Sequence, residues 1–169
     1  MGTNRSDRIL GSINRDQIYG YNGDDWINGS SGSDFITGMN DNDVIHGHIG
    51  NDFIRGHTGH DMITGGPGAD TIDGGVFDDK IWGGDGNDKI IGSHSVDMIE
   101  GNDGSDTISG GDNPDKIWGG PGDDKIFHSD SQYHTDANID TIDCGSGNDE
   151  VWVSLEDHHM NCEKVNLTN

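Results

Sequence analysis

The sequence predicts an all-β solenoid, in which short parallel strands stack into two sheets joined by tight turns. Three regular columns of residues predict it. Gly stands at position 2 and at every ninth residue up to position 119, Asp follows each Gly by five residues, and Ile follows each Asp by two, fourteen times without exception. The unit G-x-x-x-x-D-x-I-x therefore runs unbroken over residues 2–127, and fixed short periods are typical of solenoids.

The unit divides into a turn and a strand. Its first six positions are rich in Gly, Asn, Asp and Ser, which tolerate left-handed and turn conformations. Its last three positions read x-Ile-x, a short strand with one central side chain on one face. Two units make one coil of 18 residues. Because each buried Ile contributes about 1.5–3 kcal/mol, fourteen of them form a thin core between the two sheets.

The composition excludes several classes of partner. The chain has 169 residues, enough for one domain, with 28% hydrophobic residues and a net charge of −23. Such a chain stays disordered unless a repeat reuses its few apolar residues or a cation offsets its charge. The acidic surface repels nucleic acid and anionic lipid, and no apolar run approaches the ~18 residues of a membrane span. We expect a monomer with no nucleic-acid partner and no membrane insertion.

Two units carry a specific family resemblance. Residues 83–91 read G-G-D-G-N-D-K-I-I and residues 119–127 read G-G-P-G-D-D-K-I-F. They resemble the nonapeptide G-G-x-G-x-D-x-U-x of the RTX (repeats-in-toxin, hemolysin-type) calcium-binding proteins, where U is a large apolar residue. The resemblance covers residues 2–127 and resumes near 135–152. It implies a right-handed parallel β-roll of about eight two-repeat coils, with several Ca²⁺ ions held between successive turns of one edge.

The spacing explains why such turns suit calcium. Ca²⁺ takes six to eight oxygens, from carboxylates and backbone carbonyls alike. Turns on one edge recur every 18 residues, so the Asp carboxylates stack coil upon coil and two adjacent turns can complete one cage. Bound ions would also offset the repulsion between carboxylates, which couples binding to folding. The alternative is that these Asp residues only cap turns through side-chain-to-backbone hydrogen bonds.

The two edges differ at the fourth position of the unit, where the family uses Gly to bring a carbonyl onto the ion. Gly fills this position in six of the seven even-numbered repeats (the even edge, whose first repeat begins at Gly11) and in two of the seven odd-numbered repeats (the odd edge). A bulky residue such as Phe77 is a poor candidate for a positive φ. We therefore predict tight sites on the even edge and weak, partial or absent sites on the odd edge.

The predicted even-edge ligands are Asp16, Asp34, Asp52, Asp70, Asp88, Asp106, Asp124 and Asp149, with Gly32, Gly50, Gly68, Gly86, Gly104, Gly122 and Gly147 at the fourth position and Gly66, Gly84 and Gly120 at the second. The predicted odd-edge ligands are Asp7, Asp25, Asp43, Asp61, Asp79, Asp97 and Asp115.

The regular phase ends at residue 127. We expect one continuous domain with fourteen regular repeats over 1–127, an irregular loop plus final repeats over 128–152, and a C-terminal cap over 153–169. Within it, 128–143 is one expanded odd repeat, and 144–152 is a further even unit with Cys144 in the place of the first Gly. Cys144 and Cys162 are one coil apart. If the cap keeps register, they lie within disulfide range, which implies an oxidising compartment. Two free thiols, or a zinc pair with His158 and His159, are the alternatives.

The remaining residues of interest have simpler readings. The histidines of odd-edge turns, which are His57, His60, His94, His128 and His134, are interpreted as exposed turn residues. Aromatic residues at outward strand positions favour cross-strand ladders over a docking face for a partner or glycan. These residues are Trp26, Phe35, Phe53, Trp82, Trp118 and Phe127.

The sequence shows none of the motifs G-x-S-x-G or H-E-x-x-H, so we expect no enzyme. The best hypothesis is a secreted or cell-surface calcium-binding module that folds on binding Ca²⁺. The alternatives are an adhesin, matrix or ice-binding solenoid, and the accessory tail of a secreted enzyme, in which case a domain attached in the full-length protein carries the activity.

Overall fold

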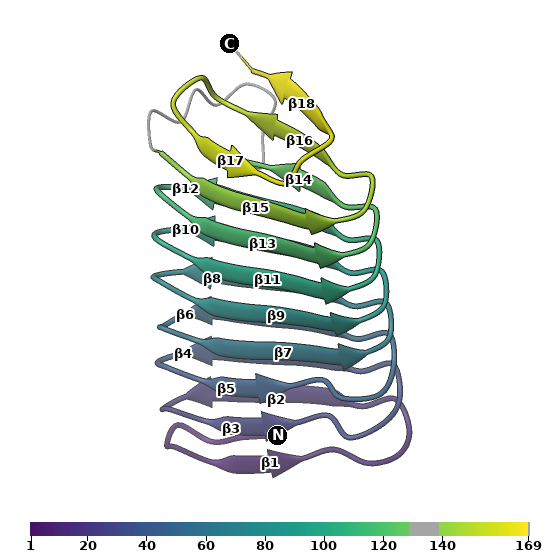
Figure 1. Cartoon of the computed structure of the whole chain (residues 1–169). Coiled ribbons are helices and arrows are strands. Elements are labelled where there is room, and N and C mark those ends of the chain that lie inside the picture. The colour runs from purple at the N-terminus through teal and green to yellow at the C-terminus, as the bar shows by residue number, and fades with distance from the viewer. Residues whose placement is uncertain (129–138, 169) are drawn as a thin grey trace.

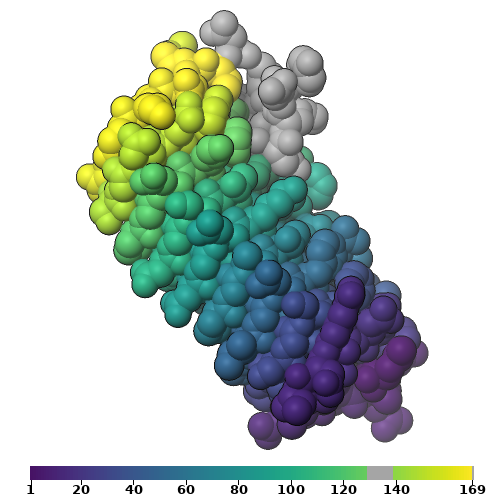
Figure 2. All heavy atoms as spheres, turned by 90° about the vertical axis from the view of Figure 1, so that its right-hand side faces the viewer, coloured from purple at the N-terminus to yellow at the C-terminus, as the bar shows by residue number. Residues whose placement is uncertain are grey.

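The protein is a right-handed parallel β-solenoid. The computed structural model describes residues 1–128 and 139–168. In Figure 1 the front strands run from left to right, the rear strands run back, and the chain rises from the N-terminus to the C-terminus, so each coil is right-handed. Even-edge turns lie at the right of this view and odd-edge turns at the left. Figure 2, which faces the even edge, shows the coils stacked along one elongated body.

Two nine-stranded sheets contain all the strands of the described residues, which include no helix and so none that could span a membrane. The first sheet holds β1 (Arg8–Leu10), β3 (Trp26–Asn28), β5 (Val44–His46), β7 (Met62–Pro67), β9 (Lys80–Asp85), β11 (Met98–Asp103), β13 (Lys116–Pro121), β15 (Thr141–Ser146) and β17 (His158–Met160). The second holds β2 (Gln17–Asn22), β4 (Phe35–Asn40), β6 (Phe53–Thr58), β8 (Thr71–Val76), β10 (Lys89–His94), β12 (Thr107–Asp112), β14 (Lys125–Phe127), β16 (Glu150–Val153) and β18 (Lys164–Leu167). The predicted fold class is confirmed.

The strand register places each core Ile on the residue at the same repeat position one coil away. Ile9 pairs with Ile27 in the first sheet and Ile18 with Ile36 in the second. The Ile side chains at every ninth position from Ile27 to Ile126 are fully buried between the sheets, and Ile142 and Val151 continue the same core. A strict period of nine leaves no other register that keeps the apolar column inside.

Outward-facing aromatic rings stack across strands. The rings of Phe35 and Phe53 lie 5.3 Å apart and nearly parallel, and those of Phe127 and Trp152 lie 4.5 Å apart. Arg8 covers the ring of Trp26 at 4.4 Å. Such pairs stabilise neighbouring strands, which supports the ladder interpretation of these residues.

The C-terminal segment adds one more coil to the solenoid. Strand β17 pairs with β15 and strand β18 pairs with β16, both parallel. Asp140 occupies the next odd-edge position although it follows Asp115 by 25 residues rather than 18, so the extra residues enter at the odd edge between β14 and β15. On both sides of residues 129–138 the register thus places Asp140 one coil beyond Asp115.

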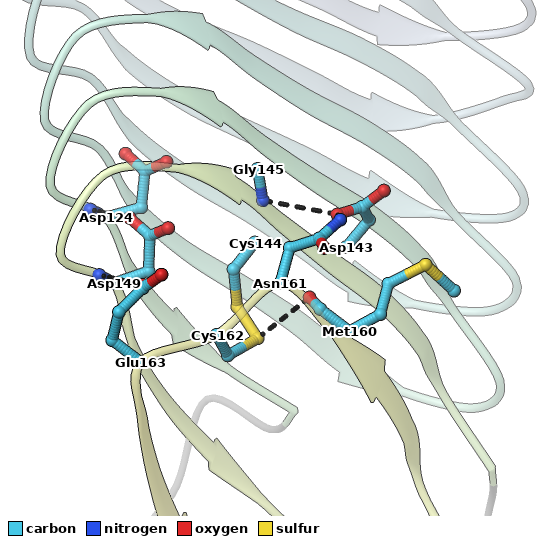
Figure 3. The surroundings of a disulfide bond; sticks show 9 residues. All are labelled: Asp124, Asp143, Cys144, Gly145, Asp149, Met160, Asn161, Cys162 and Glu163. Carbon is cyan, nitrogen blue, oxygen red and sulfur yellow. Dashed lines mark hydrogen bonds between the residues drawn. A yellow bond between two sulfur atoms is a disulfide. The ribbon is translucent and has the colours of Figure 1, made fainter.

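A disulfide joins the last two coils. Cys144 and Cys162 are bonded, with their Cα atoms 5.2 Å apart. Figure 3 shows the bond beside the stacked side chains of Asp124, Asp149 and Glu163. Cys144 is fully buried and replaces the first Gly of its unit, so the bond links the core to the final even turn.

Candidate metal sites

Each edge of the solenoid carries a column of Asp side chains that are linked by hydrogen bonds. The backbone N–H of each Asp donates to Oδ1 of the Asp one coil later, as Asp70 does to Asp88 and Asp61 does to Asp79, both at 2.8 Å. From Asp25 to Asp149, the members of both columns are at most 2% exposed. The predicted Asp residues therefore form two continuous buried columns, one on each edge.

In twelve of these residues the second carboxylate oxygen lacks a hydrogen-bond partner. Within the described residues, the buried Oδ2 atoms without a partner belong to Asp25, Asp34, Asp43, Asp52, Asp61, Asp70, Asp79, Asp88, Asp97, Asp106, Asp124 and Asp149. In these twelve residues turn capping accounts for one carboxylate oxygen and leaves the other unexplained, whereas Oδ2 of Asp7 and of Asp16 accepts a turn N–H. Because buried polar atoms nearly always have partners, a repeated orphan oxygen indicates a cation that binds there.

Burial makes these carboxylates costly to ionise. It raises the pKa of Asp79 to about 8 and that of Asp70 to about 7, while the hydrogen bond from the preceding Asp lowers each pKa in part. The pKa of Asp43, Asp97 and Asp106 is also raised to about 7, and that of Asp52, Asp61 and Asp124 to about 6. Two ionised neighbours ~5 Å apart repel by about 3 kcal/mol at an effective dielectric constant of ~20. Ionised columns therefore need a counter-cation.

On the even edge, backbone oxygens converge with the carboxylates between turns. A Cβ added to Gly50 would collide with the carbonyl oxygen of Gly32, and it would lie 3.3 Å from Oδ1 of Asp52. Gly68, Gly86, Gly104 and Gly122 repeat the same approach to the carbonyl oxygen one coil earlier. A carbonyl oxygen and Oδ1 of Asp52, which also accepts the Asp34 N–H, thus lie near the same Gly50 position, and calcium takes oxygens of both kinds.

The even edge also has the more regular turns. The N–H of Gly68 donates to the carbonyl oxygen of Asp85 at 2.8 Å, and the fourth-position glycines from Gly32 to Gly122 all make the equivalent bond, at 2.7–3.0 Å. On the odd edge Gly59 makes this bond at 3.2 Å, whereas the N–H of Gly23 donates to the side chain of Asp41 at 2.8 Å. Side chains therefore replace part of the backbone ladder on the odd edge.

The expectation that Phe77 would avoid a positive φ is wrong. Phe77 has φ 84°, and Asp41, Ser95 and Asn113 at the same odd-edge position have φ 75–85°. The stacked coils hold the turn so firmly that even a bulky residue accepts the strained conformation. The fourth-position glycines from Gly32 to Gly122 instead have φ 128–149°, which only Gly reaches readily. The odd-edge turns with a residue other than Gly therefore differ in conformation from the even-edge turns, whereas odd-edge Gly59, with φ 149°, resembles them.

Other predicted positions fall at the turns as well. Gly66, Gly84 and Gly120 have positive φ at the second position, but Tyr21 and Met39 do too, so Gly at this position does not distinguish the edges. Gly147 meets the Gly122 carbonyl like its predecessors, although its φ is not positive.

Sequence reasoning missed the last members of both columns. Asp157 accepts the N–H of Asp140 and extends the odd column, and Glu163 accepts the N–H of Asp149 and extends the even column. The motif Glu163-Lys164-Val165 repeats the pattern of Asp-Lys-Ile in earlier units. That likeness could have identified Glu163 as a column member, but Glu163 does not fall on the nine-residue spacing of the earlier units.

One histidine differs from its interpretation as an exposed turn residue. His128 is only 4% exposed, because it stands at the first position of its unit and its side chain enters the interior beside Asp157. His57, His60 and His94 are exposed as expected, and His134 lies outside the described residues.

Comparison with known proteins agrees with this geometry. A family model, the RTX calcium-binding nonapeptide repeat, matches in four copies over residues 1–36, 28–63, 64–93 and 95–130. No curated protein matches the chain. The matched repeats span most of the sequence and coincide with the two Asp columns, and the chain therefore belongs to the RTX calcium-binding nonapeptide repeat family.

Proposed function

We propose that this chain is an extracellular, non-catalytic calcium-binding module that folds when it binds Ca²⁺. The observation that carries the proposal is the repeated orphan oxygen of the buried Asp columns, at a net charge of −23. Without cations, buried charges and a thin core oppose folding. With calcium, the columns become ligands and the binding free energy contributes to folding.

The even edge is proposed to hold the tighter file of ions. Its fourth-position glycines keep an unbroken hydrogen-bond ladder, and the carbonyl oxygen of each lies close against the glycine one coil later. On the odd edge, side chains such as that of Asp41 take over turn hydrogen bonds. A carbonyl aimed elsewhere removes one ligand from each site it serves, so odd-edge sites are weaker or completed by water.

The extracellular part of the proposal is supported by the disulfide, since such bonds persist in oxidising compartments. The non-catalytic part is supported by the arrangement of the acidic groups, whose stacking in two columns is accounted for by calcium.

Circular dichroism of the oxidised chain tests the proposal. Calcium at millimolar concentration should induce β-structure from a largely disordered chelated state, and Mg²⁺ at the same concentration should not, because it demands tighter octahedral geometry. A full β spectrum in excess EDTA would contradict metal-coupled folding.

A further inference from the structure

We propose that His128, Asp140 and Asp157 form a separate site for one transition-metal cation, probed as Zn²⁺, at the C-terminal end of the odd edge. His128 directly follows β14, Asp140 precedes β15, and Asp157 precedes β17. All three side chains are buried, and one candidate ligand atom of each lies within 4.8 Å of the others. Asp140 and Asp157 are also the last members of the odd Asp column, and His128 is the residue that distinguishes this position from the calcium sites proposed above. The proposal does not depend on the proposed function.

The local sequence makes room for an imidazole that the regular repeat excludes. In regular units the first position is Gly, because a Cβ at Gly110 would collide with Oδ2 of Asp115. His128 occupies this first position, and Asp140 follows it by twelve residues where regular units place Asp five residues after Gly. His128 and Asp140 are therefore farther apart in sequence than the regular Gly and Asp, although the coil still brings their side chains close together in space.

The hydrogen bonds assign the tautomer of His128. The hydroxyl of Thr168 donates to the carbonyl oxygen of Val153 at 3.2 Å, so its single proton is used. Nε2 of His128 lies 3.0 Å from the same hydroxyl oxygen, and with the hydroxyl proton on Val153 the ring N–H at Nε2 donates to it. In the neutral ring, Nδ1 then carries the lone pair.

This lone pair faces a carboxylate with no hydrogen between them. Nδ1 of His128 is buried without a hydrogen-bond partner, and Oδ2 of Asp157 is 3.9 Å away. A proton on Nδ1 would not close this gap, since hydrogen bonds of this kind measure about 2.7–3.2 Å. One ion with bonds of about 2.0–2.2 Å can bridge the two atoms.

The donor set selects the metal. Imidazole nitrogen is a usual ligand of Zn²⁺ and related ions, whereas Ca²⁺ prefers oxygen alone. The ring N–H that donates to Thr168 is the outer contact that orients a ligating histidine. Asp157 is held in place by the N–H groups of Asp140 at 3.1 Å and Ser154 at 2.6 Å. The site is therefore built before the metal arrives.

Zinc titration of the calcium-saturated protein by calorimetry tests the site. The intact chain should bind one Zn²⁺ tightly, and His128→Gln and Asp157→Asn should each weaken that event at least tenfold. His94→Gln is the matched control, because His94 is an exposed odd-edge histidine that contacts Asp112. Unchanged zinc affinity in His128→Gln, or equal losses in His94→Gln, would overturn the proposal.

A second measurement needs no variant and so does not depend on variant folding. Crystals of the intact protein grown with calcium and zinc should show a zinc anomalous peak between His128 and Asp157. A peak elsewhere only, or calcium at this position, would overturn the proposal. The calcium-dependent change in circular dichroism would stand in either case, so the two functions fail separately.

Discussion

The edge asymmetry can be tested by a matched pair of substitutions, Asp88→Ala on the even edge and Asp79→Ala on the odd edge. The two side chains are equivalent apart from their turns. Each accepts the N–H of the Asp one coil earlier at 2.8 Å, and each is at most 2% exposed. Either substitution leaves one buried N–H without its acceptor, which costs about 1–3 kcal/mol. This part of the loss is common to both variants.

Bound calcium should make the loss of stability larger in Asp88→Ala than in Asp79→Ala. Asp88 would serve the gaps to Asp70 and Asp106, and a site filled at a calcium concentration about 100 times its Kd stabilises the fold by about 2.7 kcal/mol. Losing most of two such sites adds about 3–5 kcal/mol to the cost of Asp88→Ala in saturating calcium. Asp79→Ala adds less, since the sites that it is proposed to serve hold calcium more weakly. Its side chain also has a pKa raised to about 8, so removing it relieves a costly buried charge.

Urea unfolding followed by circular dichroism in saturating calcium measures the two free energies. Calcium titration by calorimetry counts the sites lost. The Asn variants at both positions are the control, since the amide oxygen still accepts the N–H while the charge is removed. Equal losses of stability and of bound calcium in the two Ala variants would refute the argument from the even-edge glycines.

Two further predictions concern pH and backbone strain. In chelator, the column Asp residues have folded-state pKa values of about 6–8 against about 4 in the unfolded chain, so their contribution to stability is present below about pH 4 and is lost as the pH rises through 6–8. The calcium-free chain should therefore gain β-structure on acidification toward pH 4. The calcium-bound chain should instead lose stability, because protons compete with the metal for the carboxylates. Circular dichroism across pH with and without calcium checks the sign, and parallel curves would contradict it. Phe77→Gly should raise the Tm by relieving about 1 kcal/mol of strain, whereas Gly104→Ala should lower it, because a Cβ there meets the Gly86 carbonyl oxygen. Calorimetric melting compares them, and a lower Tm for Phe77→Gly would show that its ring packing outweighs the strain.

The sequence predicted the fold and both Asp columns because one period governs them. A nine-residue phase with Ile in every unit allows one register, and Asp then stacks on Asp without further information. The phase also predicted that Cys144 and Cys162 would meet. Where a feature depends on position within the repeat, the sequence is sufficient.

Features that depend on a change in the nine-residue spacing could not be predicted from the sequence. Asp157 follows Asp140 by 17 residues and Glu163 follows Asp149 by 14, so neither falls on the regular grid although both extend the columns. The burial of His128 depends on the altered final coils, which local composition does not reveal. The positive φ of Phe77 was missed for a different reason, since it is imposed by the coils stacked around it and opposes the residue's own preference.

The ends of the solenoid are unequal, and this difference leads to the last prediction. Leu10 and Ile13 in the first coil are largely exposed, at 69% and 82%. The last coil is instead tied by the Cys144–Cys162 bond and by the hydrogen bond from Asp149 to Glu163. A bond that closes a loop of this size stabilises the fold by about 3 kcal/mol in the chain-entropy model.

Reduction in saturating calcium should therefore lower stability by about that amount and speed hydrogen exchange in β15–β18, with little change in β1–β4. The double Ser variant, treated with the same reductant, shows any effect unrelated to the bond. Freely alkylated thiols in the oxidised protein, seen by non-reducing mass spectrometry, would contradict the bond itself, and uniform acceleration along the chain would contradict its local role.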